Sequence, residues 1–194
     1  MKSNKMKALV ITPFLFLLSL VASADLRDVG YKIGPQLFRY GDSIEIKEVK
    51  ASSSGFETGE TVIVKGTYSL RSHPDAKIGV FVTQTESHGK SEILPGQQME
   101  IIEGDAVFEL SIEIRYEGYL HVTFYPTEGG RGFGGVYFGK SKQMKEIEDW
   151  TLDWYLGEPL PEGKSGTAPV IQSQVSTSSA RSRECESGAS LDLN

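Results

Sequence analysis

The clearest structural signal in the chain is the segment Gly104-Asp-Ala-Val-Phe-Glu-Leu-Ser-Ile-Glu-Ile114. Apolar side chains occupy every second position from Ala106 to Ile114, and Glu109, Ser111 and Glu113 lie between them. Successive side chains of a β-strand point to opposite faces, so this alternation predicts a strand with one buried and one solvated face. Such strands are typical of antiparallel sheets that carry a core on one side only.

The same alternation continues on both sides of this strand. Between residues 43 and 139, short alternating segments are separated by glycine, proline and polar turns, including expected turns at 72–75 and 104–105. This regular spacing of strands and turns predicts an all-β fold with seven antiparallel strands in two sheets packed face to face. The central core positions that it predicts are Val64, Val80, Leu110, Ile112 and Val122.

Two of these segments are similar to strands B and F of known β-sandwich modules. They are Glu60-Thr-Val-Ile-Val-Lys-Gly-Thr-Tyr68 and Glu117-Gly-Tyr-Leu-His-Val-Thr-Phe-Tyr125. In this pattern, residues 43–139 resemble bacterial immunoglobulin-like and fibronectin type III-like modules. The resemblance implies a seven-stranded antiparallel immunoglobulin-like sandwich over residues 43–140. The cysteine pair and third-strand tryptophan of antibody-type domains are absent from the sequence.

The first 24 residues predict a cleavable secretory signal peptide. Three lysines precede an apolar run from Ala8 to Val21, and Ala22-Ser23-Ala24 supplies a small-x-small cleavage pattern. The run is shorter than the roughly 20 residues that a membrane-spanning helix needs. We therefore expect a mature chain that begins at Asp25, carries no transmembrane segment, and is secreted or periplasmic.

Charge and cysteine usage restrict the possible partners. The full chain has a formal net charge of −6, and removal of the three signal lysines leaves −9 on the mature chain. An acidic protein of this kind is not expected to bind nucleic acid or anionic lipid. The single cysteine, Cys185, excludes an internal disulfide; we interpret it as an idle thiol, with a bridge between chains as the alternative.

The two flanks of the predicted sandwich differ in composition. Scattered hydrophobic residues in 25–42 indicate an N-terminal extension that adds an edge strand or wraps the domain. Apolar spacing within 141–162 predicts a docked amphipathic segment, with a helix over 142–156. The residues on its apolar face are Met144, Ile147, Trp150 and Trp154. Residues 163–194 are rich in serine and lack aromatic side chains, which predicts a disordered tail.

The sequence contains no recognisable catalytic or metal-binding motif. His73, His88 and His121 are not spaced as metal ligands, and we expect them to be surface residues. No nucleophile elbow is present. The sequence therefore predicts a protein that is not an enzyme, with no catalytic residue, metal or cofactor.

The glycine-rich stretch 129–135 formally matches the phosphate-binding pattern of dinucleotide sites. That pattern requires a strand before the loop and a helix after it, whereas this stretch lies between two predicted strands. We interpret it as a hairpin whose glycines adopt positive φ angles. Arg131 and Phe133 at its tip are candidates for contact with a partner.

A cluster of aromatic side chains is predicted on one outward sheet face. If the strands that contain Val80, Val122 and Val136 share a sheet, six neighbouring positions point away from the core. They are Phe81, Tyr119, His121, Thr123, Tyr125 and Tyr137. A solvated sheet face is normally polar, so these aromatics need either a cover or a partner. The Trp150/Trp154 segment is the candidate cover; stacking on sugars or contact with a protein is the alternative.

These patterns favour an exported immunoglobulin-like module that acts in binding or structure. One alternative is a carbohydrate-binding protein that uses the aromatic face. Another is an accessory or inhibitor protein that inserts the 129–135 hairpin into a partner. In each case the expected partner is a protein or glycan outside the cytoplasm.

Overall fold

The computed structural model describes residues 25–89, 92–159 and 161. The predicted signal peptide and the predicted tail, with Cys185, lie outside the described residues, and those interpretations stay predictions. Antiparallel β-sheet makes up most of the described chain, and helix is limited to α1 (Ser141–Glu146) and a 3-10 helix, η1 (Asp153–Gly157). The all-β prediction is therefore confirmed.

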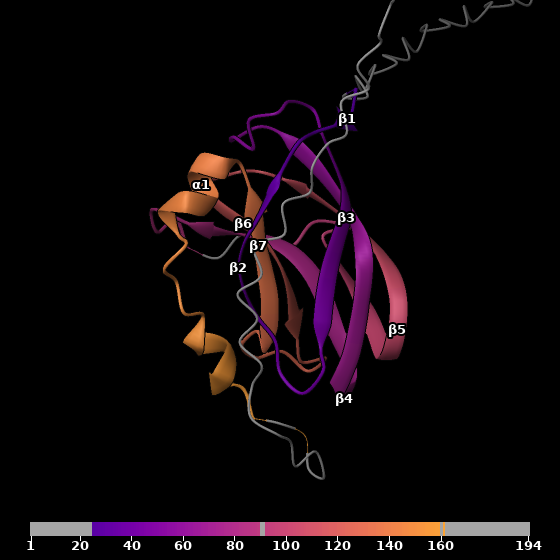
Figure 1. The fold of residues 1–194 in the computed structure, drawn as a ribbon. Helices are drawn as coiled ribbons and strands as arrows, with labels where there is room; N and C mark the ends of the chain where they lie inside the picture. Colours follow the sequence, from indigo (N-terminus) through magenta and orange to yellow (C-terminus); the bar gives the residue numbers. More distant parts are fainter. Residues whose placement is uncertain (1–24, 90–91, 160, 162–194) are drawn as a thin grey trace, which may run out of the picture.

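Seven strands form one continuous sheet rather than two separate ones. Its order is β1-β3-β4-β6-β7-β2, and β5 pairs with β4 outside this path. The strands are β1 (Arg27–Asp28), β2 (Lys32–Leu37), β3 (Ser43–Ala51), β4 (Thr61–Gln84), β5 (Gln98–Glu113), β6 (Gly118–Tyr125) and β7 (Gly134–Gly139). Figure 1 shows that this sheet curls into a half-barrel, so that its inner surface faces itself.

The sheet is continuous because β4 does not turn where the sequence suggested. Its 24 residues include both predicted strands and the expected turn at 72–75. The register with β5 jumps from Leu70↔Gly104 to Asp75↔Ile102, so four residues of β4 face one residue of β5. A bulge of this kind bends a strand without ending its pairing. The expected turn at 104–105 is likewise a point inside β5, where Gly104 has a φ of +132°.

The bend in β4 divides the curled sheet into two halves. The first half of β4 pairs with β3 and with the end of β5, whereas its second half pairs with β6 and with the start of β5. Strand β7 continues the second half beyond β6, and β2 forms its border. Residues 25–42 thus contribute the edge strand β2, as one of the two sequence interpretations predicted.

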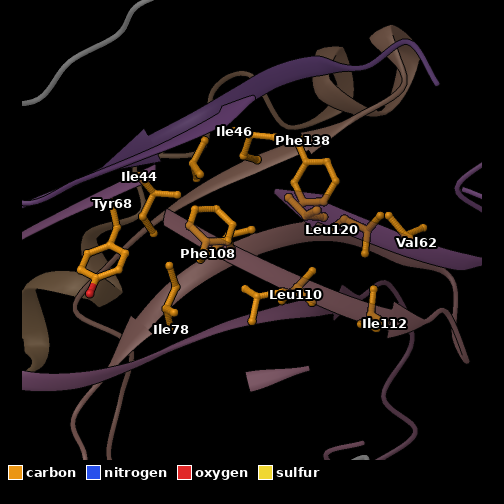
Figure 2. Close-up of a cluster of buried hydrophobic side chains, with 14 of the residues drawn as sticks. Ile44, Ile46, Val62, Tyr68, Ile78, Phe108, Leu110, Ile112, Leu120 and Phe138 are labelled. Carbon is orange, nitrogen blue, oxygen red and sulfur yellow. The ribbon is translucent and has the colours of Figure 1, made fainter. Parts of the chain in front are cut away.

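The hydrophobic core lies between the two halves of the curled sheet. Figure 2 shows Ile44 and Ile46 from one half facing Ile78 and Leu120 from the other. All five predicted core residues belong to this cluster and are at most 5 % exposed: Val64, Val80, Leu110, Ile112 and Val122. The alternation pattern therefore predicted the inward face of each strand correctly.

The segment after β7 is not the single helix that its apolar spacing predicted. Helix α1 ends after six residues, and Leu152 adopts a left-handed conformation with φ +58° before η1 begins. Met144 and Ile147 are buried as predicted, while the change of direction buries Leu152 and leaves Trp154 exposed. We call residues 141–159 the C-terminal strap. In Figure 1 it lies to one side of β7, which both of its helices contact.

Candidate ligand pocket on the aromatic face

Three strands bring the predicted aromatic residues into one row. Phe81 of β4 is paired with His121 of β6, and His121 is paired with Tyr137 of β7. The ring centroids of Phe81 and His121 are 6.2 Å apart, and those of His121 and Tyr137 are 5.0 Å apart. Tyr125 adds an edge-to-face contact with Phe81 at 5.3 Å. The predicted register of this aromatic face (Phe81, Tyr119, His121, Tyr125 and Tyr137) is confirmed.

The C-terminal strap covers part of the aromatic face. Trp150 makes edge-to-face contacts with Tyr119 at 5.4 Å and with Tyr137 at 5.6 Å. A second hydrophobic cluster forms beneath it from Leu37, Tyr137, Met144, Ile147, Leu152 and Tyr155. Among the aromatic rings, Trp154 contacts Trp150 and Tyr155 of the strap, and its side chain remains 45 % exposed. The interpretation in which this segment folds back onto the sheet is therefore correct for Trp150.

Three hydrogen bonds hold the C-terminal strap against the rest of the chain. The guanidinium of Arg39 donates to the carbonyl of Glu158 at 2.5 Å and also to the carbonyl of Tyr155. Burial lowers the pKa of Arg39, against the opposing influence of nearby Tyr40, Glu158 and Asp42. The Glu158 carboxylate accepts the backbone N–H of Arg131 at 3.0 Å. These bonds set the position of η1 above the aromatic face.

A pocket of about 590 Å³ remains between the strap and the aromatic face. The sheet contributes side chains from β4, β6 and β7, and the strap contributes both tryptophans of the chain. The lining residues are Thr83, His121, Tyr125, Gly132, Tyr137, Asp149, Trp150, Thr151, Trp154 and Tyr155. The pocket is thus walled mainly by aromatic rings from two different parts of the chain.

Hydroxyl groups form short networks in the pocket wall. The Thr83 hydroxyl lies 2.8 Å from the Tyr137 hydroxyl and 3.3 Å from Nδ1 of His121. Beside it, the hydroxyls of Thr123 and Tyr155 are 2.8 Å apart. Thr123 and Tyr155 are buried, whereas Thr83 is partly exposed; its hydroxyl can donate one hydrogen bond and accept others, so it keeps capacity for a polar ligand.

Burial keeps the pocket lining largely uncharged. It lowers the pKa of His121 to about 4, so the imidazole is neutral at physiological pH. Burial also raises the pKa of Tyr125 to about 12 and raises the pKa of Tyr137 and Tyr155. Among the described residues that line the pocket, the exposed carboxylate of Asp149 is the only formal charge.

The other predicted contact residues do not form a projecting hairpin tip. Phe133 is completely buried, stacked 3.9 Å from the ring of His73 and 5.7 Å from that of Phe124. Its N–H donates to the carbonyl of Phe124 at 3.0 Å, which draws the segment onto the end of β6. Arg131 is exposed, as expected. The structure therefore places Phe133 in the core and only Arg131 at the surface.

Two of the three histidines are buried, which corrects the expectation of surface positions. His121 is 7 % exposed beneath the strap, and His73 is 5 % exposed in the bulge of β4, whereas His88 is exposed. The His121 ring is covered by Phe81 and Tyr137, which the alternation pattern placed on the same face. The His73 ring is covered by Phe133, which no local pattern placed nearby.

A buried serine, histidine and aspartate meet at the bulge of β4. The Ser72 hydroxyl is 2.5 Å from a carboxylate oxygen of Asp42 and 2.7 Å from Nδ1 of His73. Asp42 also accepts the backbone N–H of Ser72 at 2.9 Å. Ser72 is fully buried and lies between its two partners, unlike a catalytic serine, whose hydroxyl faces the substrate. This cluster therefore satisfies the polar groups of the bulge.

Sequence analysis missed several residues of the pocket. Thr83 and Tyr155 were not singled out, and Trp150 and Trp154 were considered only as a cover. The alternation of β4 contains a signal for Thr83, because it lies two residues after Phe81 on the same face. Tyr155 reaches the pocket through the left-handed turn at Leu152, which the apolar spacing does not reveal.

The chain matches no protein-family model, no curated protein and no solved structure. Within residues 25–89, 92–159 and 161, no group of three or more histidine, cysteine, aspartate or glutamate side chains is placed to hold a metal ion. No helix in this described part of the chain is both long enough and apolar enough to cross a membrane.

Proposed function

We propose that the protein is an exported, non-catalytic immunoglobulin-like binding module whose ligand site is the pocket beneath the C-terminal strap. One observation carries the proposal: a cavity of about 590 Å³ stays open after the strap has packed onto the aromatic face. Pockets for small ligands commonly measure about 300–1,000 Å³ and combine apolar walls with a few polar groups. The lining described above has this composition.

Strand pairing supports the immunoglobulin-like part of the proposal. In such modules strands A, B and E belong to one sheet, and strands C, F and G to the other. Here β3, the first half of β4 and the end of β5 are neighbours, and so are the second half of β4, β6 and β7. The continuous β4 then corresponds to strands B and C joined through the bulge.

The chemistry of the lining favours a neutral carbohydrate as the ligand. Sugars present apolar C–H faces that stack on aromatic rings and hydroxyl groups that bond to polar side chains. Trp154 and Tyr125 offer rings, and the Thr83 hydroxyl, 3.3 Å from Nδ1 of His121, offers a polar group. A charged ligand would lose hydration in a lining that offers little compensating charge. The hairpin-insertion alternative is less favoured because Phe133 lies in the core.

A glycan array probed with the exported chain tests the ligand class. We expect the chain to bind neutral glycans. The Trp154→Ala variant loses one stacking ring, so its affinity should fall at least about tenfold, which corresponds to about 1.4 kcal/mol of binding free energy. Leu156→Ala is the matched control, because Leu156 is exposed in the same 3-10 helix but does not line the pocket. Equal binding by the two variants, or no binding to any neutral glycan, would contradict the proposal.

Export is tested separately from binding. Cells that express the full chain should release it from the cytoplasm, and N-terminal sequencing of the released protein should begin at Asp25. The basis is the lysine-rich start, the apolar run and the Ala22-Ser23-Ala24 pattern. Released protein that begins with Met1 would show that no signal is cleaved.

A further inference from the structure

Strand β5 has one unpaired edge along the border of the curled sheet. It pairs with β4 along one side, and no strand of the described chain pairs with its other side. In Figure 1, β5 forms the border of the half-barrel opposite the C-terminal strap. An unpaired edge presents backbone N–H and C=O groups that can pair with another extended chain.

The direction of the free backbone groups follows from one hydrogen bond. The N–H of Ser111 donates to the carbonyl of Gly96 at 2.8 Å and therefore points away from β4. The register between β5 and β4 is unbroken from Gly104 to Glu113, so backbone groups alternate regularly along this part of the strand. Asp105, Val107 and Glu109 consequently point their N–H and C=O groups toward the open edge.

Exposed apolar side chains accompany this open edge. Ile102 is 72 % exposed and Val107 is 75 % exposed, the two highest values among the large hydrophobic residues described as exposed. Both lie on β5, while the inward residues Phe108 and Leu110 are buried in the core. A paired strand along the edge would cover side chains that otherwise face water.

The charge of β5 indicates which kind of chain fits this edge. Its 16 residues include five carboxylates and no basic side chain: Glu100, Glu103, Asp105, Glu109 and Glu113. Asp105 and Glu109 form ion pairs with Arg71 and Lys65 of the neighbouring strand β4. The N···O distances are 2.5 Å for Arg71–Asp105 and 2.9 Å for Lys65–Glu109. A second copy of β5 would set carboxylates opposite carboxylates, which is destabilising, whereas a basic strand would set opposite charges side by side.

We propose that the open edge of β5 binds an extended basic polypeptide segment by strand addition. The edge supplies main-chain hydrogen bonds at Asp105, Val107 and Glu109, and the exposed side chains of Ile102 and Val107 give apolar contact. The carboxylates select lysine or arginine at alternate positions of the partner. This is the general mode in which peptides extend a sheet, with pockets or charges on alternate side chains providing specificity.

The test uses the exported chain and a synthetic peptide of alternating valine and lysine. Binding should slow amide hydrogen exchange at Asp105, Val107 and Glu109, and added salt should weaken the affinity. A peptide of alternating valine and glutamate is the control and should not bind. Equal binding of both peptides would overturn the proposal. So would protection of the Asp105, Val107 and Glu109 amides without peptide, since another part of this chain or a second copy would then occupy the edge.

Substitution at Val107 separates strand addition from simple charge attraction. Proline at this position removes an N–H that β4 does not use, so Val107→Pro should lower the peptide affinity at least about tenfold. Val107→Thr keeps the N–H and loses only one methyl contact, so its affinity should fall far less than that of Val107→Pro. If Val107→Pro does not fold, the double variant Glu100→Gln with Glu113→Gln decides, and should show weaker binding and a smaller salt dependence. Unchanged peptide binding by Val107→Pro, or by the double variant if Val107→Pro does not fold, would overturn the proposal.

Discussion

His121 is the side chain on which the character of the pocket depends most. Its ring contacts Phe81 and Tyr137, and its Nδ1 lies 3.3 Å from the Thr83 hydroxyl. Because burial lowers its pKa to about 4, the imidazole contributes a neutral polar group rather than a charge. The hydrogen-bonding wall of the pocket is therefore expected to keep the same form across the physiological pH range.

The buried imidazole also predicts how stability depends on pH. In the unfolded chain His121 titrates near 6.5, and in the folded chain near 4, so the unfolded state binds more protons between these values. The free energy of unfolding should fall as the pH drops from about 6.5 toward 4, by at most about 3 kcal/mol from this residue. Denaturant unfolding at pH 7 and pH 4.5 measures the fall, which His121→Gln should reduce.

His73 serves as the internal comparison for this experiment. Burial also lowers its pKa, so it contributes to acid sensitivity with the same sign and remains present in His121→Gln. The difference between the two proteins therefore reports His121 alone. Identical pH dependence in both would show that His121 is not held neutral by the fold.

Tyr137 is predicted to contribute mainly to stability, and Tyr125 mainly to ligand binding. Tyr137 is fully buried in the second hydrophobic cluster, so Tyr137→Ala should lower the free energy of unfolding by about 3–5 kcal/mol. Tyr125 is only partly buried, so Tyr125→Ala should cost clearly less while weakening ligand binding. Melting curves and binding titrations of both variants check this difference. A larger loss of stability from Tyr125→Ala would reverse the assigned roles.

At the level of elements, the sequence was most informative about regular alternation. Period-two patterning alone predicts which residues of β4, β6 and β7 point inward. It also predicts the row formed by Phe81, His121 and Tyr137. It does not predict the continuity of β4, because Ser72 and His73 have turn-like composition. Asp42, which is 30 residues from Ser72, accepts hydrogen bonds from Ser72, and the Ser72 hydroxyl in turn bonds to His73. Such long-range polar contacts leave no local signal in the sequence.

The strap shows a second limit of local patterns. Met144, Ile147 and Trp150 have the spacing of one helical face, and all three do face the sheet or the rings on it. The left-handed residue Leu152 interrupts that geometry and brings Tyr155 down to Thr123. The pocket exists because of this interruption, so its full lining was not predictable from helical spacing.

Arg39 is predicted to hold the strap in place. Arg39→Met keeps the apolar stem of the side chain but removes the hydrogen bonds to the carbonyls of Tyr155 and Glu158. The loss should lower the free energy of unfolding by about 2 kcal/mol, since bonds from charged donors are stronger than neutral ones. It should also speed amide exchange in residues 150–158. Lys47→Met, at an exposed ion pair, is the control, and equal behaviour of both variants would count against this role.

At the scale of the whole molecule, one core joins the two halves of the curled sheet. Leu110 of β5 and Val122 of β6 lie on opposite halves and are both fully buried. Leu110→Ala and Val122→Ala should each lower the free energy of unfolding by about 2–4 kcal/mol through lost burial and residual cavity. Denaturant midpoints measure the effect. Near-native midpoints for both variants would mean that the halves do not share this core.

The pocket and the open edge of β5 lie on different halves of the curled sheet, because Thr83 belongs to the second half of β4 and residues 105–109 pair with its first half. The strap lies against β7 and β2, whereas β5 borders the opposite half (Figure 1). Substitutions at Trp154 and at Val107 should therefore act independently, because distant sites without shared partners have nearly additive effects. A ligand in the pocket and a peptide on β5 are accordingly expected to bind at the same time.

Tryptophan fluorescence tests the ligand pocket most directly, because the chain contains two tryptophans and both line the pocket. The full chain is titrated with neutral oligosaccharides built from glucose, N-acetylglucosamine or mannose. We expect at least one of them to produce a saturable change in emission that is retained in Leu156→Ala and lost or strongly weakened in Trp154→Ala. If no neutral oligosaccharide changes the emission at millimolar concentration, the pocket is not a carbohydrate site.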